Sequence, residues 1–318
     1  MKNIYSNIFK PNNINLRKAK NIIKNNNIIG LPTETVYGLA GNAYSDEAVE
    51  KIFKLKKRPK FNPLIVHFKS LKELKKDVIC TPIFIKLYKA FCPGPITFIL
   101  NKKSQSKISK IVTAGKKTVA VRVPKHVVAR NLLKILKSPL AAPSANISFK
   151  LSSTSARDVV DEFGHKIKFI LDGGQCKIGL ESTIIDLTSK LAILRQGAVS
   201  AEQIQKILRK KIINNKKSKS IKAPGQLKSH YYPGIPVLMN KTTPKKNEAF
   251  ITFGNKFKDA NNRFNLSKDN NLNEAANNLY RIMRKIKKKK FKSMIVCKIP
   301  NKGIGRAIND RLKKASFK

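Results

Sequence analysis

The stretch Leu31-Pro-Thr-Glu-Thr-Val-Tyr-Gly-Leu39 decides how this chain folds and where its ligand site lies. The apolar run that leads into it, from Ile28 to Leu31, predicts a short buried strand. The strand enters a turn that is rich in hydroxyl groups and contains Gly38. Such a turn can present two threonine side chains and backbone N–H groups to a small polar ligand.

Four later segments supply the other groups that a binding pocket would need. They are Lys56-Lys57-Arg58, His67, Thr118 with Arg122, and Ser144-Ala145-Asn146. Together they offer fixed cations, an imidazole, and hydroxyl and amide donors. A pocket of this composition suits a nucleotide phosphate and a small carboxylate better than a peptide or a lipid.

Short apolar runs alternate with helical patterns from Ile28 to about Gln196. The patterns predict strands at 28–31, 64–68, 96–100, 118–123, 140–143, 169–172, 182–187 and 191–195. They predict helices near 15–25, 71–76, 82–90, 129–136, 155–163 and 201–211, and a clearer one that begins after Ser45. This alternation predicts an α/β fold of about 190 residues with a twisted mixed sheet and flanking helices.

The remainder of the chain predicts a connecting segment and a second, smaller α/β domain. Residues 212–222 are polar, and residues 223–236 are dense in proline and glycine but also carry His230, Tyr231 and Tyr232. A passive linker would not usually contain those three side chains. Strands at 250–253 and 293–299 and helices at 272–286 and 305–312 are expected beyond it. The predicted division is therefore 1–211, 212–236 and 237–318.

Composition excludes several classes of protein. The chain has 318 residues, of which 41% are hydrophobic, enough for a folded core. No run of about 18 apolar residues predicts a membrane span, and no secretory signal is visible, so the cytoplasm is the expected location. The cysteines show no paired spacing, which argues against a zinc cluster or a disulfide framework; they are Cys80, Cys92, Cys176 and Cys297.

The chain is very basic. It has 67 Lys and Arg against 18 Asp and Glu, a formal net charge of +49. Such a charge can indicate nucleic-acid binding, because dense Lys and Arg displace counterions from phosphate chains. Lys, Asn and Ile are abundant together, however, which is also the result of an AT-rich coding sequence. Weak, non-specific affinity for RNA is expected under either interpretation.

Each candidate residue also has a structural interpretation. Lys56 and Arg58 follow an amphipathic helix and could clamp a phosphate, but single basic pairs are common in so basic a chain. His67 ends a predicted strand, where a structural role is the more frequent one. Arg122 shares a strand face with Thr118 and Ala120, and could either receive a carboxylate or be solvated. Ser144 and Asn146 follow the end of a strand, where ligand sites of α/β sheets tend to lie.

Several familiar motifs are absent from the sequence. It contains no P-loop, no dinucleotide-binding glycine fingerprint and no His/Cys metal spacing, so no metal site is expected in the protein. It also lacks a nucleophile elbow and an evident Ser/His/Asp set. Any ATP would therefore be held by a non-standard site, and covalent catalysis is not favoured.

The ordered set of motifs resembles the threonylcarbamoyl-AMP synthase family in its two-domain form, a YrdC-like catalytic domain followed by a small C-terminal domain. The segments that carry the resemblance are PTETVYGLA (32–40), KKRP (56–59), NPLIVH (62–67), PGPITFIL (93–100), TVAVRVP (118–124), APSAN (142–146), DGG (172–174), LESTIID (180–186), LRQGAV (194–199), PGQLKSHYYP (224–233) and GIGRAINDRLKKA (303–315). They span nearly the whole chain. Each motif is weak alone, whereas their order and spacing are highly specific.

The resemblance implies an enzyme that joins L-threonine, bicarbonate and ATP into threonylcarbamoyl-AMP and pyrophosphate. The product would feed the threonylcarbamoyl modification of the adenosine beside the anticodon of tRNA, through a tRNA-modifying transferase complex. By resemblance, the threonine pocket comprises Thr35, His67, Arg122, Ala142 and Ser182, with Arg122 on the carboxylate. The nucleotide would be bound by Arg58, Asn62, Thr118, Ser144, Asn146, Ser152, Arg195 and Tyr231, and Lys56 would complete the basic pair at the phosphates.

The implied chemistry is coherent with these residues. The threonine amine would attack CO2 or bicarbonate, and the carbamate oxygen would then attack the α-phosphate, with Mg2+ on the pyrophosphate. A carbamate is unstable in water, so the segment that carries Tyr231 is expected to close over the site as a lid. Lys57 departs from the family pattern, which usually has glycine between the two cations.

Two other functions remain as alternatives. The first is a basic RNA-binding module without catalysis, which the net charge would fit. It predicts tight, structure-specific RNA binding at physiological salt together with failure to bind ATP. The second is a carbamoyl-transferring relative that acts in hydrogenase maturation and shares the YrdC-like domain. The chain lacks the zinc-finger cysteines expected of that relative.

Overall fold

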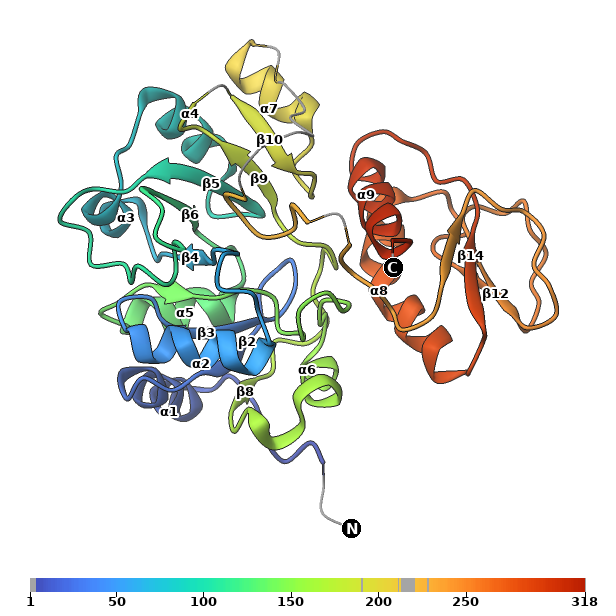
Figure 1. Cartoon of the computed structure of the whole chain (residues 1–318), viewed down its shortest axis with the longest axis horizontal. Coiled ribbons are helices and arrows are strands. Elements are labelled where there is room, and N and C mark those ends of the chain that lie inside the picture. The colour runs from blue at the N-terminus through green and yellow to red at the C-terminus, as the bar shows by residue number, and fades with distance from the viewer. Residues whose placement is uncertain (1–3, 190, 211, 213–220, 228, 318) are drawn as a thin grey trace.

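The computed structural model describes residues 4–189, 191–210, 212, 221–227 and 229–317, which form two sheets (Figure 1). The larger sheet has ten strands in the order β1-β8-β2-β3-β7-β4-β6-β5-β9-β10. It is mixed, because β4 and β6 pair in parallel whereas β5 and β6 are antiparallel. The smaller sheet has four parallel strands in the order β11-β14-β12-β13. The predicted α/β fold with a mixed sheet and a second small α/β unit is confirmed.

The elements of the larger unit closely follow the predicted pattern. Its strands are β1 (Ile8–Phe9), β2 (Ile29–Leu31), β3 (Gly38–Asn42), β4 (Ile65–His67), β5 (Ile96–Asn101), β6 (Thr118–Arg122), β7 (Leu140–Ala141), β8 (Ile170–Leu171), β9 (Thr183–Asp186) and β10 (Ala192–Arg195). Its helices are α1 (Asn13–Lys24), α2 (Asp46–Lys56), α3 (Leu71–Asp77), α4 (Pro82–Phe91), α5 (Val127–Ile135), α6 (Ala156–Phe163) and α7 (Ala201–Leu208), with a 3-10 turn at Gly164–Lys166. Helix α7 ends before the predicted residue 211, which lies outside the described residues.

Strand β1, of two residues, was not predicted, and neither was β3, because its two glycines argue against a strand. Strand β3 pairs antiparallel with β2, so the 32–37 segment is the turn of a hairpin whose register sets Leu31 opposite Gly38. Glycine is needed here for close packing rather than for turn geometry. A Cβ on Gly41 would lie 3.2 Å from the Ile28 side chain and 3.3 Å from that of Ile52 on α2.

Helix α2 positions the basic pair, because Lys56 is its last residue and Arg58 follows it. The Ser45 side chain accepts a hydrogen bond from the backbone N–H of Ala48 and caps its first turn, as predicted. The helix ends at Lys57, which adopts the left-handed conformation with φ 49°. Glycine is favoured at such a C-terminal position because it has no Cβ to clash. Lys57 adopts this conformation without a glycine, and its exposed side chain does not crowd the loop.

The alternation along β6 separates a packing face from a ligand face. Val119, Val121 and Val123 belong to the core that the large sheet shares with α2, α4 and α7. Ala120 belongs to a different, smaller cluster on the opposite face. Ala223 of the connecting segment packs into that second cluster, so the segment crosses the ligand face of the sheet.

The C-terminal unit packs against the larger one through a common apolar core. Its elements are β11 (Val237–Met239), β12 (Glu248–Thr252), β13 (Arg263–Asn265), α8 (Leu272–Lys288), β14 (Ser293–Val296) and α9 (Gly305–Ala315). Strands β11 and β13 were not predicted and have three residues each, too few to show a period. The shared core also includes Val36, Leu151, Leu180 and Tyr231 from outside this unit.

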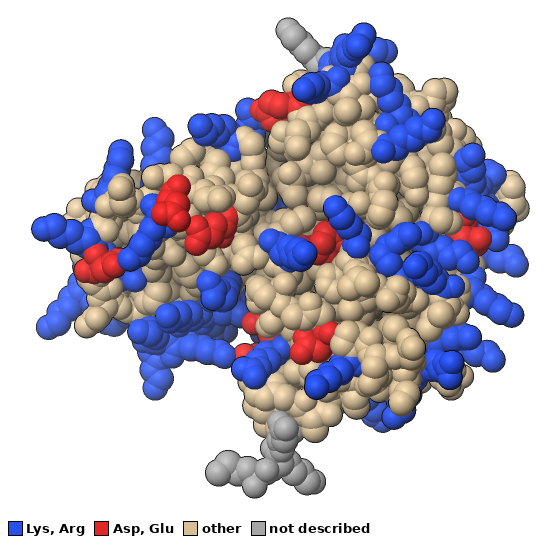
Figure 2. All heavy atoms as spheres, turned by 180° about the vertical axis from the view of Figure 1, so that it is seen from behind, with Lys and Arg blue, Asp and Glu red and all other residues tan. Residues whose placement is uncertain are grey.

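Basic side chains are spread over the surface of both units. Figure 2 shows Lys and Arg across one whole face of the molecule, with few acidic residues between them. This distribution accounts for the net charge of +49 without assigning it to one site. Among the described helices, none is both long and apolar enough to cross a membrane.

Candidate active site

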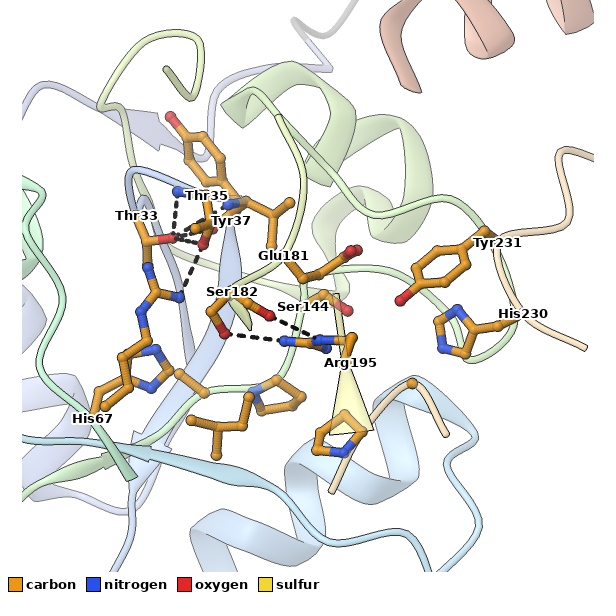
Figure 3. A pocket seen from close by; sticks show the side chains of 18 of the residues that line it. Thr33, Thr35, Tyr37, His67, Ser144, Glu181, Ser182, Arg195, His230 and Tyr231 are labelled. Atoms are coloured by element: carbon orange, nitrogen blue, oxygen red, sulfur yellow. Dashed lines mark hydrogen bonds between the residues drawn. The ribbon is translucent and has the colours of Figure 1, made fainter. Parts of the chain in front are cut away.

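A cavity opens on the ligand face of the large sheet, beneath the connecting segment (Figure 3). About 540 Å³ of empty space lies within its lining, part of it open solvent at the mouth of the cavity. Its lining comes from segments far apart in sequence: Thr33, Thr35, Val36, Tyr37, Gly38, Arg58, Ile65, His67, Arg122, Ala142, Pro143, Ser144, Glu181, Ser182, Arg195, Pro224, Gly225, His230 and Tyr231. Many of the predicted site residues thus converge on one cavity.

Arg122 is held rigidly at one end of this cavity. Its Nη2 lies 2.7 Å from Glu34 Oε1, its Nη1 donates to Thr35 Oγ1 at 2.9 Å, and its Nε donates to the Gly94 carbonyl. Burial alone would raise the pKa of Glu34, but the charge and hydrogen bonds of Arg122 lower it below its usual value. Three of the five N–H groups of Arg122 therefore have partners within the described chain, which leaves two for a ligand carboxylate.

His67 lies beside Arg122 because the two residues are in register on β4 and β6. The imidazole is buried, and Nδ1 has no hydrogen-bond partner among the described residues. Burial and the positive charge of Arg122 lower the pKa of His67 to about 3. His67 is therefore neutral at physiological pH and offers the cavity a polar edge without a charge.

The depressed pKa of His67 predicts a loss of stability in acid. The folded pKa of about 3 is below the ordinary histidine value of about 6.5, so the unfolded chain binds the proton first as pH falls. The free energy of unfolding should therefore fall progressively below pH 6.5. Between pH 7 and pH 5 the protonation of His67 in the unfolded chain should lower it by about 2 kcal/mol. The measurement is urea unfolding of the wild type and His67→Gln at both values. Parallel pH dependences in the two proteins would exclude this effect.

Arg58 points into the cavity from the loop that follows α2. Its Nε donates to the Asn62 carbonyl at 2.9 Å, and its Nη2 donates to Asn62 Oδ1 at 2.7 Å and to the Pro63 carbonyl at 2.9 Å. These bonds fix the guanidinium plane. Burial and the nearby charge of Arg195 lower the pKa of Arg58 to about 9, so it stays protonated at neutral pH.

Arg195 enters the same cavity from the end of β10. Its Nε donates to the Ser182 carbonyl and its Nη2 to Ser182 Oγ, both at 3.0 Å (Figure 3). Ser182 Oγ is also 2.7 Å from Thr97 Oγ1. The hydroxyl of Ser182 is thus part of a buried network rather than an isolated donor.

Arg58 and Arg195 bring two buried positive charges to the cavity wall. Both are buried, and within the described part of the chain neither forms an ion pair with a carboxylate. Two neighbouring buried cations that form no ion pair of their own are costly unless a ligand supplies negative charge. A nucleotide phosphate would supply that charge and match the planar guanidinium donors.

The connecting segment closes one side of the cavity with His230 and Tyr231. The two rings lie 4.0 Å apart, and Tyr231 stacks on Tyr280 of α8 at 5.8 Å. Tyr231 is 1% exposed and has a φ of 63°, a backbone conformation that places its ring inward. Burial lowers the pKa of His230 to about 3 and raises that of the Tyr231 hydroxyl, so both are neutral.

Similarity to known proteins extends over nearly the whole chain. The profile of the Sua5/YciO/YrdC family, described as "Telomere recombination", matches residues 21–197, and that of "Threonylcarbamoyl-AMP synthase, C-terminal domain" matches residues 199–316. A protein named threonylcarbamoyl-AMP synthase from Pyrococcus abyssi is 37% identical over 95% of this chain and 94% of its own length. The chain belongs to the threonylcarbamoyl-AMP synthase family.

Other relatives agree with this assignment. The threonylcarbamoyl-AMP synthase of Bacillus subtilis is 33% identical over 96% of this chain and 94% of its own length. A crystal structure of P. abyssi Sua5 complexed with L-threonine superposes with a TM-score of 0.86 at 36% identity, covering 95% of this chain and 94% of that one. The family resemblance read from the motifs is confirmed, and a non-catalytic RNA-binding module is not favoured.

Not every residue predicted from the family pattern lies on the cavity wall. Lys56 is 1% exposed, and its Nζ donates to the carbonyls of Ser144 and Asn146 at 2.5 Å each. Asn146 in turn donates to the carbonyls of Ile147 and Lys150. The side chains of Lys56 and Asn146 thus hold the 144–150 loop in place without lining the cavity, whereas Ser144 itself lines it.

Three further predicted residues are also absent from the lining. Asn62 faces Arg58 and holds it in place, as described above. The Ser152 hydroxyl donates to Glu181 Oε1 at 2.5 Å. Thr118 is half-buried at the start of β6, at the opposite end of that strand from Arg122.

Three residues within the motifs contribute to the site although no role was predicted for them. Glu181 and His230 line the cavity, and Glu34 pairs with Arg122. His230 stood out in its Pro- and Gly-rich segment, but nothing in the sequence pattern separated the two glutamates from surface acids. Their positions depend on partners distant in the chain.

Proposed function

We propose that this protein makes threonylcarbamoyl-AMP and pyrophosphate from L-threonine, bicarbonate and ATP, as a nucleotidyltransferase that serves tRNA threonylcarbamoyl-adenosine modification. The observation that carries the proposal is a single cavity with two different ends. One end presents Arg122 with the hydroxyl of Thr35, and the other presents the unpaired cations Arg58 and Arg195. An amino-acid carboxylate suits the first end and a triphosphate suits the second.

The proposed threonine pocket contains Thr35, His67, Arg122, Ala142 and Ser182, all of which line the cavity. The proposed nucleotide site contains Arg58, Ser144, Arg195 and Tyr231 on the wall itself. Behind them, Asn62, Asn146, Ser152 and Lys56 would act by holding wall residues in place. Thr118 shares a face with Arg122, so a nucleotide that extends along β6 could reach it.

In the proposed reaction, the neutral threonine amine attacks CO2 and loses a proton to form a carbamate; attack on bicarbonate would release water instead. A carbamate oxygen then attacks the α-phosphate of ATP, and pyrophosphate leaves. Arg58 and Arg195 would neutralise phosphate charge, and the cavity would align the carbamate with the α-phosphate. Coverage by His230 and Tyr231 would limit hydrolysis of the carbamate before it reacts.

We propose that Mg2+ enters with ATP, as part of the substrate. Among the described residues, no group of three or more His, Cys, Asp or Glu side chains could hold a metal ion. The carboxylate of Glu181 on the cavity wall is already bonded to Arg311, Ser152 and Tyr280. The protein therefore fits a metal that is held chiefly by phosphates and water, as Mg2+ usually is.

The proposed setting follows from the product. Threonylcarbamoyl-AMP is an unstable mixed anhydride, so a tRNA-modifying transferase complex should accept it quickly, in the cytoplasm. Weak tRNA binding would be compatible with the basic surface. The division into a catalytic domain (1–211), a connecting lid (212–236) and a C-terminal domain (237–318) belongs to this proposal. Residues 211, 213–220 and 228 lie outside the described residues.

The direct test is pyrophosphate release from ATP with purified protein. Release should require both L-threonine and bicarbonate, because no carbamate forms without them. Reactions that lack threonine or bicarbonate, or contain L-valine in place of threonine, are the controls. Equal release without threonine would contradict the proposed reaction. Structure-specific RNA binding at physiological salt together with no binding of ATP would instead support the RNA-binding module.

A further inference from the structure

Glu181 stands out in the cavity because its charge opposes the proposed ligand. It is the only carboxylate on the cavity wall among the described residues, and it lies next to Ser182, which holds Arg195. Figure 3 shows Glu181 near Arg195 and Tyr231. A free carboxylate in this position would repel a phosphate and would compete with it for Arg195.

The partner of Glu181 comes from the C-terminal domain. Arg311 of α9 lies 2.8 Å from Glu181 Oε2 through its Nε, and its Nη2 donates to the Gln196 carbonyl at 2.9 Å. Ser152 donates to Glu181 Oε1, and the Tyr280 hydroxyl is 3.2 Å from each carboxylate oxygen. The ion pair is almost completely buried, with side chains 1% and 6% exposed.

The charges of this cluster fix the protonation state of Glu181. Burial alone would raise its pKa, but the charges of Arg311 and Arg195, with the Ser152 hydrogen bond, lower it to about 2. Glu181 is therefore ionised at neutral pH and interacts with both arginines. Arg311 is the one that makes the close contact, whereas Arg195 is bonded to Ser182.

We propose that Arg311 is a positioning residue for the nucleotide: it binds the Glu181 carboxylate and thereby leaves Arg195 available for a phosphate group. This inference rests on the function proposed above. It gives the C-terminal domain a defined part in ATP binding, through a charge placed behind the cavity wall.

Two further contacts of α9 lie at the same end of the cavity. The Arg311 guanidinium lies 5.1 Å from the centre of the Tyr231 ring, and Lys314 Nζ donates to the Gly225 carbonyl at 2.8 Å. Gly225 and Tyr231 are both wall residues. The helix that neutralises Glu181 therefore also contacts the segment that covers the cavity.

The test compares Arg311→Met with the double variant Arg311→Met/Glu181→Gln. In the single variant Glu181 is released to pair with Arg195, so affinity for a non-hydrolysable ATP analogue should fall roughly 10- to 100-fold. Threonine affinity, measured separately by calorimetry, should change little. In the double variant the competing charge is gone, and glutamine retains a carbonyl for Ser152. Affinity for the analogue should then recover to near the wild-type value.

The threonine measurement separates the proposal from a purely structural role. If Arg311 only braced the domains, the single variant would lose thermal stability and threonine affinity along with its affinity for the analogue, and the double variant would regain all three together. Arg306→Met is the matched control, because Arg306 lies on the same helix but pairs with Glu202 at the surface. Its affinity for the analogue should equal that of the wild type. Arg311→Lys, which keeps the charge, should lose less affinity for the analogue than Arg311→Met.

Several outcomes would overturn the inference. One is unchanged affinity for the analogue in folded Arg311→Met. Another is a double variant that folds, by its thermal transition, yet binds the analogue as weakly as the single variant. If the single variant fails to fold, a folded double variant with strongly reduced affinity for the analogue would also overturn the inference. Failure of the wild type itself to bind the ATP analogue would instead contradict the proposed function.

Discussion

Replacing Arg58 with alanine should reduce kcat/KM for ATP by roughly 100- to 1,000-fold, the effect of removing one preorganised charged donor from a reacting group. Arg58 is buried, points into the cavity, and is held by three hydrogen bonds to Asn62 and Pro63. Its charge is therefore placed before the nucleotide arrives. Threonine affinity, measured by calorimetry without ATP, should be nearly unchanged.

The control for this prediction lies two residues away. Lys60 is exposed on the same loop, and Lys60→Ala removes the same formal charge without touching the cavity. Its kcat/KM for ATP should match that of the wild type. Equal, small losses in both variants would mean that only the general positive field attracts ATP, and the phosphate clamp would be excluded.

Lys56→Ala extends the same test to the second predicted cation. Because Lys56 Nζ bonds to the carbonyls of Ser144 and Asn146, its loss should disorder the loop that carries Ser144. Turnover with ATP should fall, as it would for a direct phosphate contact, but thermal stability should fall as well. Wild-type rates in both Lys56→Ala and Arg58→Ala would contradict the assignment of this basic pair to ATP.

Replacing Arg122 with alanine should have the largest effect on threonine. The affinity for threonine should fall by a few kcal/mol, because its carboxylate would be buried without a partner. The same change leaves Glu34 buried beside Thr35 with its ion pair broken, which typically costs about 3–5 kcal/mol of folding stability. Threonine KM and urea unfolding would measure the two effects separately, and affinity for an ATP analogue should change much less.

A double variant distinguishes the binding role of Arg122 from its role in folding. Arg122→Met/Glu34→Gln removes both charges and should recover most of the lost stability, since no ion remains buried alone. Threonine binding should remain weak, because the cation is still missing. Wild-type threonine KM in this variant would remove Arg122 from the threonine site.

Much of the fold was predictable because its signals are local. Ser45 caps α2 as its side chain predicts, and Val119 and Val121 alternate with Ala120 and Arg122 as a strand requires. The order of the motifs across the chain was also sufficient to indicate the family. The exceptions were the short strands β1, β11 and β13, and strand β3, whose glycines conceal a strand that lies close to α2.

The sequence by itself determined the main elements and the family, and it predicted that Arg58, Arg122 and Ser144 would meet at one cavity, as they do. Only the tertiary structure decided which side chains face the cavity and which hold it from behind. Lys56 is turned toward two carbonyls, and Glu181 is paired with Arg311, 130 residues further along the chain. Periodicity and capping report on neighbours within a few residues, whereas the partner of a buried charge is set by which distant segments pack together.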